Sequence, residues 1–93
     1  MQEVTKPEPI ELKGIVFGMQ LLELNIERGG KDFGRMFEAA ICQILIERYR
    51  LKWHEVAFAM GVKSQAEINR MKDYHRKHFQ TNQTYQNIFN QLK

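Results

Sequence analysis

Apolar residues recur at three- and four-residue intervals along much of this 93-residue chain, which is the spacing of one face of an α-helix. The pattern predicts helices over 33–49, 53–60, 64–79 and 85–92, with polar residues on their opposite faces. The residues expected on the buried faces are, in chain order, Phe37, Ala40, Ile41, Ile44, Leu45, Trp53, Val56, Ala57, Met60, Ile68, Met71, His75, Phe79, Tyr85, Ile88, Phe89 and Leu92. The chain is therefore predicted to be all-helical.

Local start and stop signals support these limits. Asp32 is expected to cap the helix that begins at Phe33, because its carboxylate can accept from the free amides of a first turn. Gly61 is expected to end the helix over 53–60. Ser64 and Glu67 form the clearest signal, a capping box in which each side chain accepts from the other residue's backbone amide.

The first third of the chain is more ambiguous. Residues 1–9 contain two prolines and are expected to form a flexible lead-in. In residues 10–30 the apolar positions fit a helical face, although those between 22 and 26 also alternate as in a strand. We favour a helix that ends at the paired glycines 29 and 30.

The chain is long enough for one small domain. The three helices between residues 31 and 80 contain enough apolar residues to fill a core of their own. Two further apolar stripes remain, over 10–28 and over 85–92. Either these stripes fold back and enlarge the core, or they form a docking helix or the seam of a homodimer.

Charge is distributed unevenly along the chain. Residues 1–62 carry eight Lys and Arg against nine Asp and Glu, whereas residues 63–93 carry six against two. The formal net charge of +3 therefore resides in the last third. Such an asymmetry points to an anionic partner that approaches one element of the fold.

The aromatic spacing and the turn resemble a known family. Phe33 and Trp53 are twenty residues apart, and the segment from Trp53 to Ser64 is similar to the second helix and turn of Myb/SANT-type, homeodomain-like modules. Ile68 matches the buried aliphatic residue of that family's third helix. The chain departs from the pattern where Phe33 replaces a Trp that precedes an acidic cluster, and where Lys72 falls near the third aromatic position.

The resemblance implies a three-helix, homeodomain-like bundle over residues 31–80, with an additional N-terminal helix and a short C-terminal segment over 81–93. It also implies binding to double-stranded DNA, with the helix over 64–79 in the major groove. Asn69 and Arg70 suit base edges. The other basic residues, Lys63, Lys72, Arg76 and Lys77, suit phosphates. The expected interface comprises Lys63, Gln65, Asn69, Arg70, Lys72, Asp73, Arg76 and Lys77.

Two other interpretations of this basic helix stand beside DNA binding. In the first, the basic face is only solvated and binds no partner. Asp73 is three residues from Arg70 and four from Lys77, so it could form local ion pairs with both. Some SANT modules bind protein partners instead, which implies an adaptor without nucleic-acid contact. Under the DNA-binding hypothesis, we expect an accessory subunit of a chromatin-associated or DNA-modifying assembly, such as a methyltransferase complex. If the source is eukaryotic, we expect the protein to be nuclear.

Other functional classes are disfavoured by the residues present. His75 and His78 have a spacing that metal sites use, but no further ligands complete a set, so neither metal nor cofactor is expected. No nucleophile, base and oxyanion donor come together, so we expect neither an enzyme nor a small-molecule substrate. No stretch approaches the length of a membrane span, and no secretory signal is expected. The single Cys42, in an apolar run, indicates a buried thiol and a reducing compartment.

Overall fold

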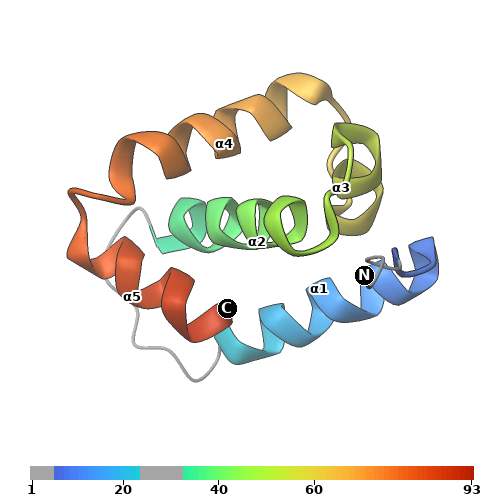
Figure 1. Ribbon diagram of the computed structural model, residues 1–93, viewed down its shortest axis with the longest axis horizontal. Helices are drawn as coiled ribbons and strands as arrows, with labels where there is room; N and C mark the ends of the chain where they lie inside the picture. The colour runs from blue at the N-terminus through green and yellow to red at the C-terminus, as the bar shows by residue number, and fades with distance from the viewer. Residues whose placement is uncertain (1–5, 24–32) are drawn as a thin grey trace, which may run out of the picture.

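The computed structural model describes residues 6–23 and 33–93, and these form five helices without a strand. The helices are α1 (Pro9–Glu23), α2 (Phe33–Tyr49), α3 (Trp53–Met60), α4 (Gln65–His78) and α5 (Gln83–Leu92) (Figure 1). The predicted all-helical class is confirmed for these residues. The homeodomain-like arrangement of the three middle helices stays a prediction.

The N-terminal segment is helical over α1, so the preference for helix over strand is confirmed as far as Glu23. The expected lead-in is one residue too long, because Pro9 is the first residue of α1. A proline is well placed there, since the first helical position needs no amide donor. The remainder of the 10–30 segment, the paired glycines and the Asp32 cap lie outside the described residues.

Helix α2 is the centre of the fold, with α4 on one side and α1 and α5 on the other (Figure 1). Its buried residues are Phe33, Met36, Phe37, Ala39, Ala40, Ile41, Cys42, Ile44 and Leu45. All five positions predicted for its buried face are among them. The other four are buried as well, because neighbouring helices cover α2 on more than one side. The pattern of a single amphipathic stripe predicts burial on one side of a helix only.

Both outlying apolar stripes contribute to the core. In α5, Tyr85, Ile88, Phe89 and Leu92 are at most 5% exposed and pack mainly against α2. In α1, Leu12, Val16 and Met19 are buried against α3 and α2. Both stripes therefore fold back and enlarge the core, as the first alternative predicts, whereas a self-sufficient core within residues 31–80 stays a prediction.

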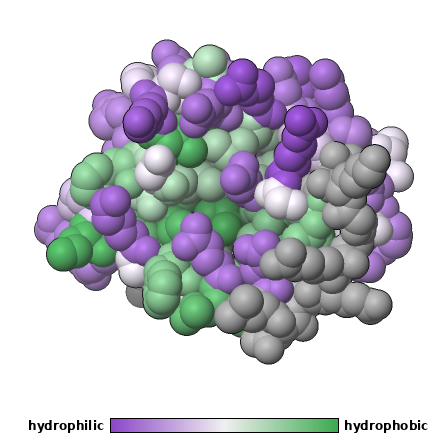
Figure 2. Space-filling view, turned by 180° about the vertical axis from the view of Figure 1, so that it is seen from behind, coloured by the Kyte–Doolittle hydropathy of each residue, from purple (hydrophilic) through white to green (hydrophobic). Residues whose placement is uncertain are grey.

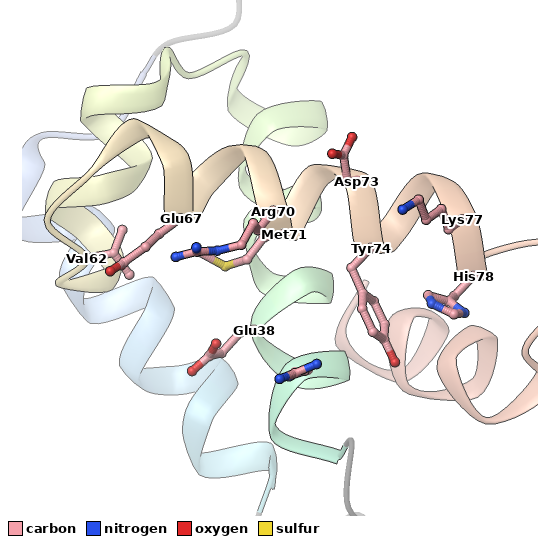
Figure 3. Close-up of a pocket in the computed structure, with 10 residues that line it drawn as sticks. Glu38, Val62, Glu67, Arg70, Met71, Asp73, Tyr74, Lys77 and His78 are labelled. Carbon is pink, nitrogen blue, oxygen red and sulfur yellow. The ribbon is translucent and has the colours of Figure 1, made fainter.

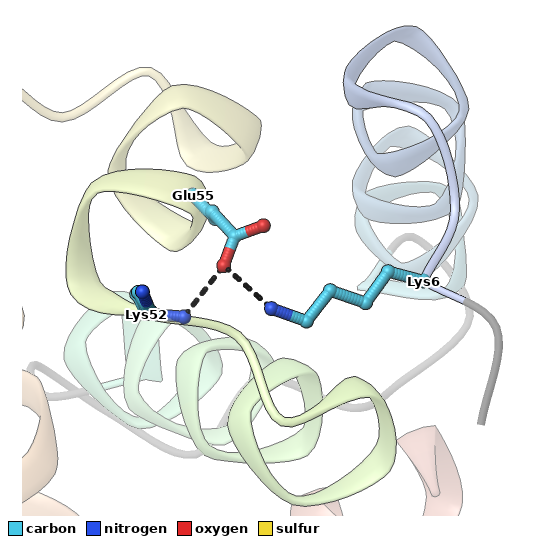
Figure 4. Close-up of polar contacts among 3 residues, drawn as sticks. All are labelled: Lys6, Lys52 and Glu55. Carbon is cyan, nitrogen blue, oxygen red and sulfur yellow. Dashed lines mark hydrogen bonds and ion pairs between the residues drawn. The ribbon is translucent and has the colours of Figure 1, made fainter. Parts of the chain in front are cut away.

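A polar contact also joins the segment before α1 to the start of α3. Glu55 Oε1 accepts from the Lys52 backbone amide at 2.9 Å and from Lys6 Nζ at 3.2 Å (Figure 4). The Lys52 amide, and to a smaller extent Lys6, lowers the pKa of the Glu55 carboxyl. Because the group is exposed, this contact orders the start of α3 more than it stabilises the fold.

Trp53 is not buried, contrary to expectation. Its side chain is 42% exposed, whereas Val56 and Ala57 on the same helix are buried and Met60 is half-buried. Trp53 lies on the inward side of the helical wheel but at the first residue of α3. A residue at a helix end can lack a neighbouring helix to cover it, and the ring contacts His54 edge-on instead.

An aromatic cluster joins α4 to α5. The Tyr85 hydroxyl lies 2.7 Å from His75 Nδ1, and the His75 ring packs 4.9 Å from Phe79 and 5.0 Å from Phe89, measured between ring centres. The expected inward orientation of His75 and Phe79 is confirmed. Burial raises the pKa of the Tyr85 phenol far above its usual value and lowers the pKa of His75, so at neutral pH the hydrogen bond joins two uncharged groups.

We expect His75 to make the protein less stable in mild acid. Burial lowers the pKa of His75 below its ordinary value of 6.5 in the folded state, and Glu47 only partly opposes this. Well above pH 6.5 the imidazole is neutral in both states. As the pH falls below that value, the unfolded chain binds the proton first and stability is lost. Urea unfolding at about pH 7.5 and about pH 5 measures this loss.

The double variant His75→Phe/Tyr85→Phe should show a smaller loss over the same range, because it removes both polar partners together. His54→Gln is the matched control, since His54 is exposed. An equal dependence on pH in wild type and the double variant would show that His75 does not cause it.

Candidate nucleic-acid interface

The turn between α3 and α4 fixes where α4 begins. Gly61 has a left-handed backbone (φ 73°), and its amide donates to carbonyls at the end of α3. The Val62 amide then donates to the Ala57 carbonyl at 3.0 Å. Any residue with a Cβ would be strained at Gly61, so the direction in which the chain leaves α3 depends on this glycine.

Helix α4 is capped and anchored as predicted. Ser64 Oγ accepts from the Glu67 amide at 3.3 Å, which is the Ser64 half of the expected capping box. Ile68 is fully buried and Met71 is 8% exposed, and both pack toward α2. The opposite side of α4 is therefore held outward by the packing of its inner side.

All eight residues of the predicted interface are exposed. They are Lys63, Gln65, Asn69, Arg70, Lys72, Asp73, Arg76 and Lys77. At 100° per residue, Arg70, Asp73 and Lys77 lie opposite the buried side, and Gln65, Asn69, Lys72 and Arg76 lie on one flank. The structure thus brings all of them onto one surface, formed by α4 and the turn before it. Figure 2 shows hydrophilic residues along the top of the molecule, over α4.

The expected ion pairs of Asp73 are not the ones observed. Asp73 Oδ1 pairs with Arg76 Nη2 at 2.7 Å rather than with Arg70 or Lys77. Both partners are more than half exposed, so the pair contributes little to stability. Within residues 6–23 and 33–93, neither Arg70 nor Lys77 forms an ion pair. Two cations on the outermost side are thereby left for an anionic partner.

The helix dipole explains only some of the basic residues. Cations stabilise the last turn of a helix, and Arg76 and Lys77 lie there. Lys63 precedes the helix, and Arg70 and Lys72 lie in its middle. These three positions gain nothing from the dipole, so helix stability does not account for them.

A groove runs beside α4 on the flank opposite Asn69 and Lys72. It has a volume of about 800 Å³, with Met71 at its wall and with Arg35 and Glu38 contributed by α2 (Figure 3). Figure 3 shows Tyr74 and His78 directed from α4 into it and Asp73 directed away. Arg35 was not predicted as part of this surface, because helical periodicity does not reveal that the first turn of α2 lies next to α4.

The remaining polar candidates have structural roles. His75 is hydrogen-bonded to the Tyr85 hydroxyl, and the centre of the His78 ring lies 4.3 Å from that of the Tyr74 ring. In the described parts of the chain, no three His, Cys, Asp or Glu side chains are placed to hold a metal ion. Burial raises the pKa of the Cys42 thiol to about 11, partly offset by Lys72, so the predicted buried thiol is confirmed.

Comparison with protein-family models, with curated proteins and with solved structures gives no match to this chain. The similarity to Myb/SANT modules accordingly stays a prediction from the residues themselves. None of the described helices is long and apolar enough to cross a membrane.

Proposed function

We propose that this protein is a DNA-binding helix-turn-helix protein that inserts α4 into the major groove of double-stranded DNA. The observation that carries the proposal is the exposed basic surface of α4, on a helix that is capped at Ser64 and backed by α2. In this proposal Asn69 and Arg70 contact base edges. Lys63, Lys72, Arg76 and Lys77 contact phosphates, which adds affinity without sequence preference.

A single helix of this kind provides limited discrimination between sequences. We therefore propose that the protein acts as an accessory subunit, which supplies duplex affinity to a chromatin-associated or DNA-modifying assembly. In a eukaryotic cell this role places it in the nucleus. The proposal involves no catalysis by the chain itself.

The groove beside α4 favours a second candidate function. Its lining combines cations with Glu38 and Glu67 and with the apolar side chain of Met71, which suits a peptide better than a phosphate backbone. In this alternative the protein is a SANT-type adaptor, and α4 meets an acidic protein partner. An adaptor has no need of affinity for random duplex.

The salt dependence of duplex binding tests the first proposal. Each phosphate contact contributes a slope of about −0.9 in log K against log salt, so the four proposed phosphate contacts give a slope of about −4. Fluorescence anisotropy with a labelled random duplex should show affinity falling by about 10²–10³ between 50 and 200 mM salt. Arg70→Glu/Lys77→Glu should weaken binding at low salt by at least about tenfold and flatten the slope.

The control is Lys52→Glu/Lys93→Glu, which lowers the net charge equally. Both side chains are exposed. Lys52 immediately precedes α3, on the other side of Glu55 from Lys6 (Figure 4), and Lys93 follows α5. The control should bind duplex nearly as wild type does. If the α4 variant is folded and binds with unchanged affinity and slope, the DNA-binding proposal is wrong.

A further inference from the structure

Helix α1 has a second apolar side that the fold does not use. Ile10 is 79% exposed, Phe17 is 60% exposed and Leu21 is nearly half exposed. They lie on the side of α1 opposite Leu12 and Val16, which are buried. Figure 2 shows hydrophobic residues gathered at the lower left of the molecule, over α1.

This apolar side extends onto α3. Phe58 is 52% exposed, and its ring centre lies 4.4 Å from Lys13 Nζ, one turn of α1 from Phe17. We call Ile10, Phe17, Leu21 and Phe58 together the outer face. Monomeric proteins rarely expose contiguous apolar patches of more than a few hundred Å². The largest such patch on a protein is often functional, so the outer face is a candidate interaction surface.

The exposed area is close to what a symmetric dimer requires. An aromatic side chain can bury about 150–250 Å², so Phe17 and Phe58 together offer on the order of 200 Å², and the two aliphatic residues offer a similar amount. A twofold interface uses the same patch twice, which brings the buried total near 1,000 Å² once the polar rim is included. That value lies at the lower end of specific protein interfaces.

Two glycines permit close approach along the same side. Gly14 and Gly18 are exposed, and a Cβ built on either would meet nothing within 4 Å. Each glycine weakens the helix by roughly 1 kcal/mol relative to alanine, although the monomer has room for a side chain. A second helix packed over this strip would explain the two glycines, because the absence of a Cβ lets the two backbones approach closely. The isolated fold contains no such contact at either glycine.

The charges around the outer face favour another copy of the chain over a lipid surface. Glu11 and Lys13 lie on opposite flanks, so two parallel α1 helices related by a twofold axis place Glu11 of one copy near Lys13 of the other. Membrane-surface helices instead carry a basic rim. Here α1 carries two acidic residues, Glu11 and Glu23, against one basic residue, Lys13.

We propose that the outer face is the seam of a homodimer, in which two α1 helices pack side by side across their glycines. This inference does not depend on the proposed DNA binding. In Figure 1, α1 and α4 lie on opposite sides of α2, so the seam leaves both copies of α4 uncovered. A dimer would therefore present two basic surfaces that face away from each other.

Sedimentation equilibrium without DNA tests the proposal, from about 5 to about 300 μM protein. The wild type should pass from the mass of one chain to that of two across this range. Phe17→Glu/Leu21→Glu should weaken association at least tenfold. The fold should survive because both side chains are exposed, which far-UV circular dichroism checks. The charge-matched control, Thr84→Glu/Asn90→Glu, changes exposed residues of α5 and should dimerise as wild type does.

A second variant separates the seam from helix stability. Gly14→Gln/Gly18→Gln replaces both glycines by a better helix former, so the melting temperature of the dilute monomer should rise. Its dimerisation should nevertheless weaken, because the added side chains separate the two helices. A wild type that remains one chain in mass over the whole range, or a glutamate variant that associates unchanged, overturns the proposal. So does flotation of a monomeric wild type with lipid vesicles.

Discussion

A chain that ends at Gln80 is expected to lose cooperative folding. The truncation removes α5, whose Tyr85, Ile88, Phe89 and Leu92 are almost completely buried. Burial of such a side chain contributes about 1.5–3 kcal/mol, so their combined loss is about 6–12 kcal/mol. The total stability of a domain of this size is about 5–15 kcal/mol. Thermal melting followed by circular dichroism should show a broad, non-cooperative change.

The truncation also uncovers α2 and leaves His75 without the Tyr85 hydroxyl, which adds to the loss. Thr84→Ala/Asn90→Ala is the control, because it alters only exposed positions and keeps α5 in place. This variant should melt close to the wild-type temperature. A sharp transition of the truncated chain near that temperature would show that α5 is an accessory and that residues 31–80 fold alone.

Replacement of Ile68 by alanine is expected to cost about 2–5 kcal/mol of unfolding free energy. Ile68 is fully buried and, with Met71, attaches α4 to the rest of the core. The removed methyl and methylene groups leave a cavity that the rigid contact between α2 and α4 can fill only in part. Urea unfolding at neutral pH measures the loss as a shift of the midpoint.

A graded series makes this expectation sharper. Ile68→Val removes one methylene and should cost about 0.5–1.5 kcal/mol, whereas Asn69→Ala next to it should change stability by less than about 0.5 kcal/mol. Duplex binding by Ile68→Ala should fall only in proportion to its unfolded fraction if Ile68 acts through the fold. Equal stability of all three variants would mean that α4 is not anchored through Ile68.

Helix limits were largely predictable because their causes lie within a few residues. The expected limits of α2 and α3 agree with the structure, and those of α4 differ by one residue at each end. Ser64 caps α4 and Gly61 ends α3 through backbone geometry and neighbouring amides alone. Such contacts are set before any tertiary packing exists.

The side of α4 that carries the candidate interface was also predictable, whereas its exposure depended on which elements pack nearby. A helix with Ile68 and Met71 on one side must present Arg70 and Lys77 on the other, whatever it packs against. The ion pair of Asp73 was not predictable, because Arg70, Arg76 and Lys77 are all within reach along the same helix. The choice of Arg76 depends on side-chain conformations that spacing does not determine.

Residue patterns alone therefore predicted the apolar stripes of the helices, the signals at Gly61 and Ser64 that end α3 and cap α4, and the side of α4 that carries the basic residues. The tertiary structure alone decided that Trp53 is partly exposed, that α5 completes the core, that Arg35 lies beside α4 and that one side of α1 stays uncovered. The physical reason is the separation along the chain of the residues that interact. Helices and caps arise from contacts between residues up to four apart, whereas burial depends on which distant segments cover a surface, and many arrangements satisfy the same periodic pattern.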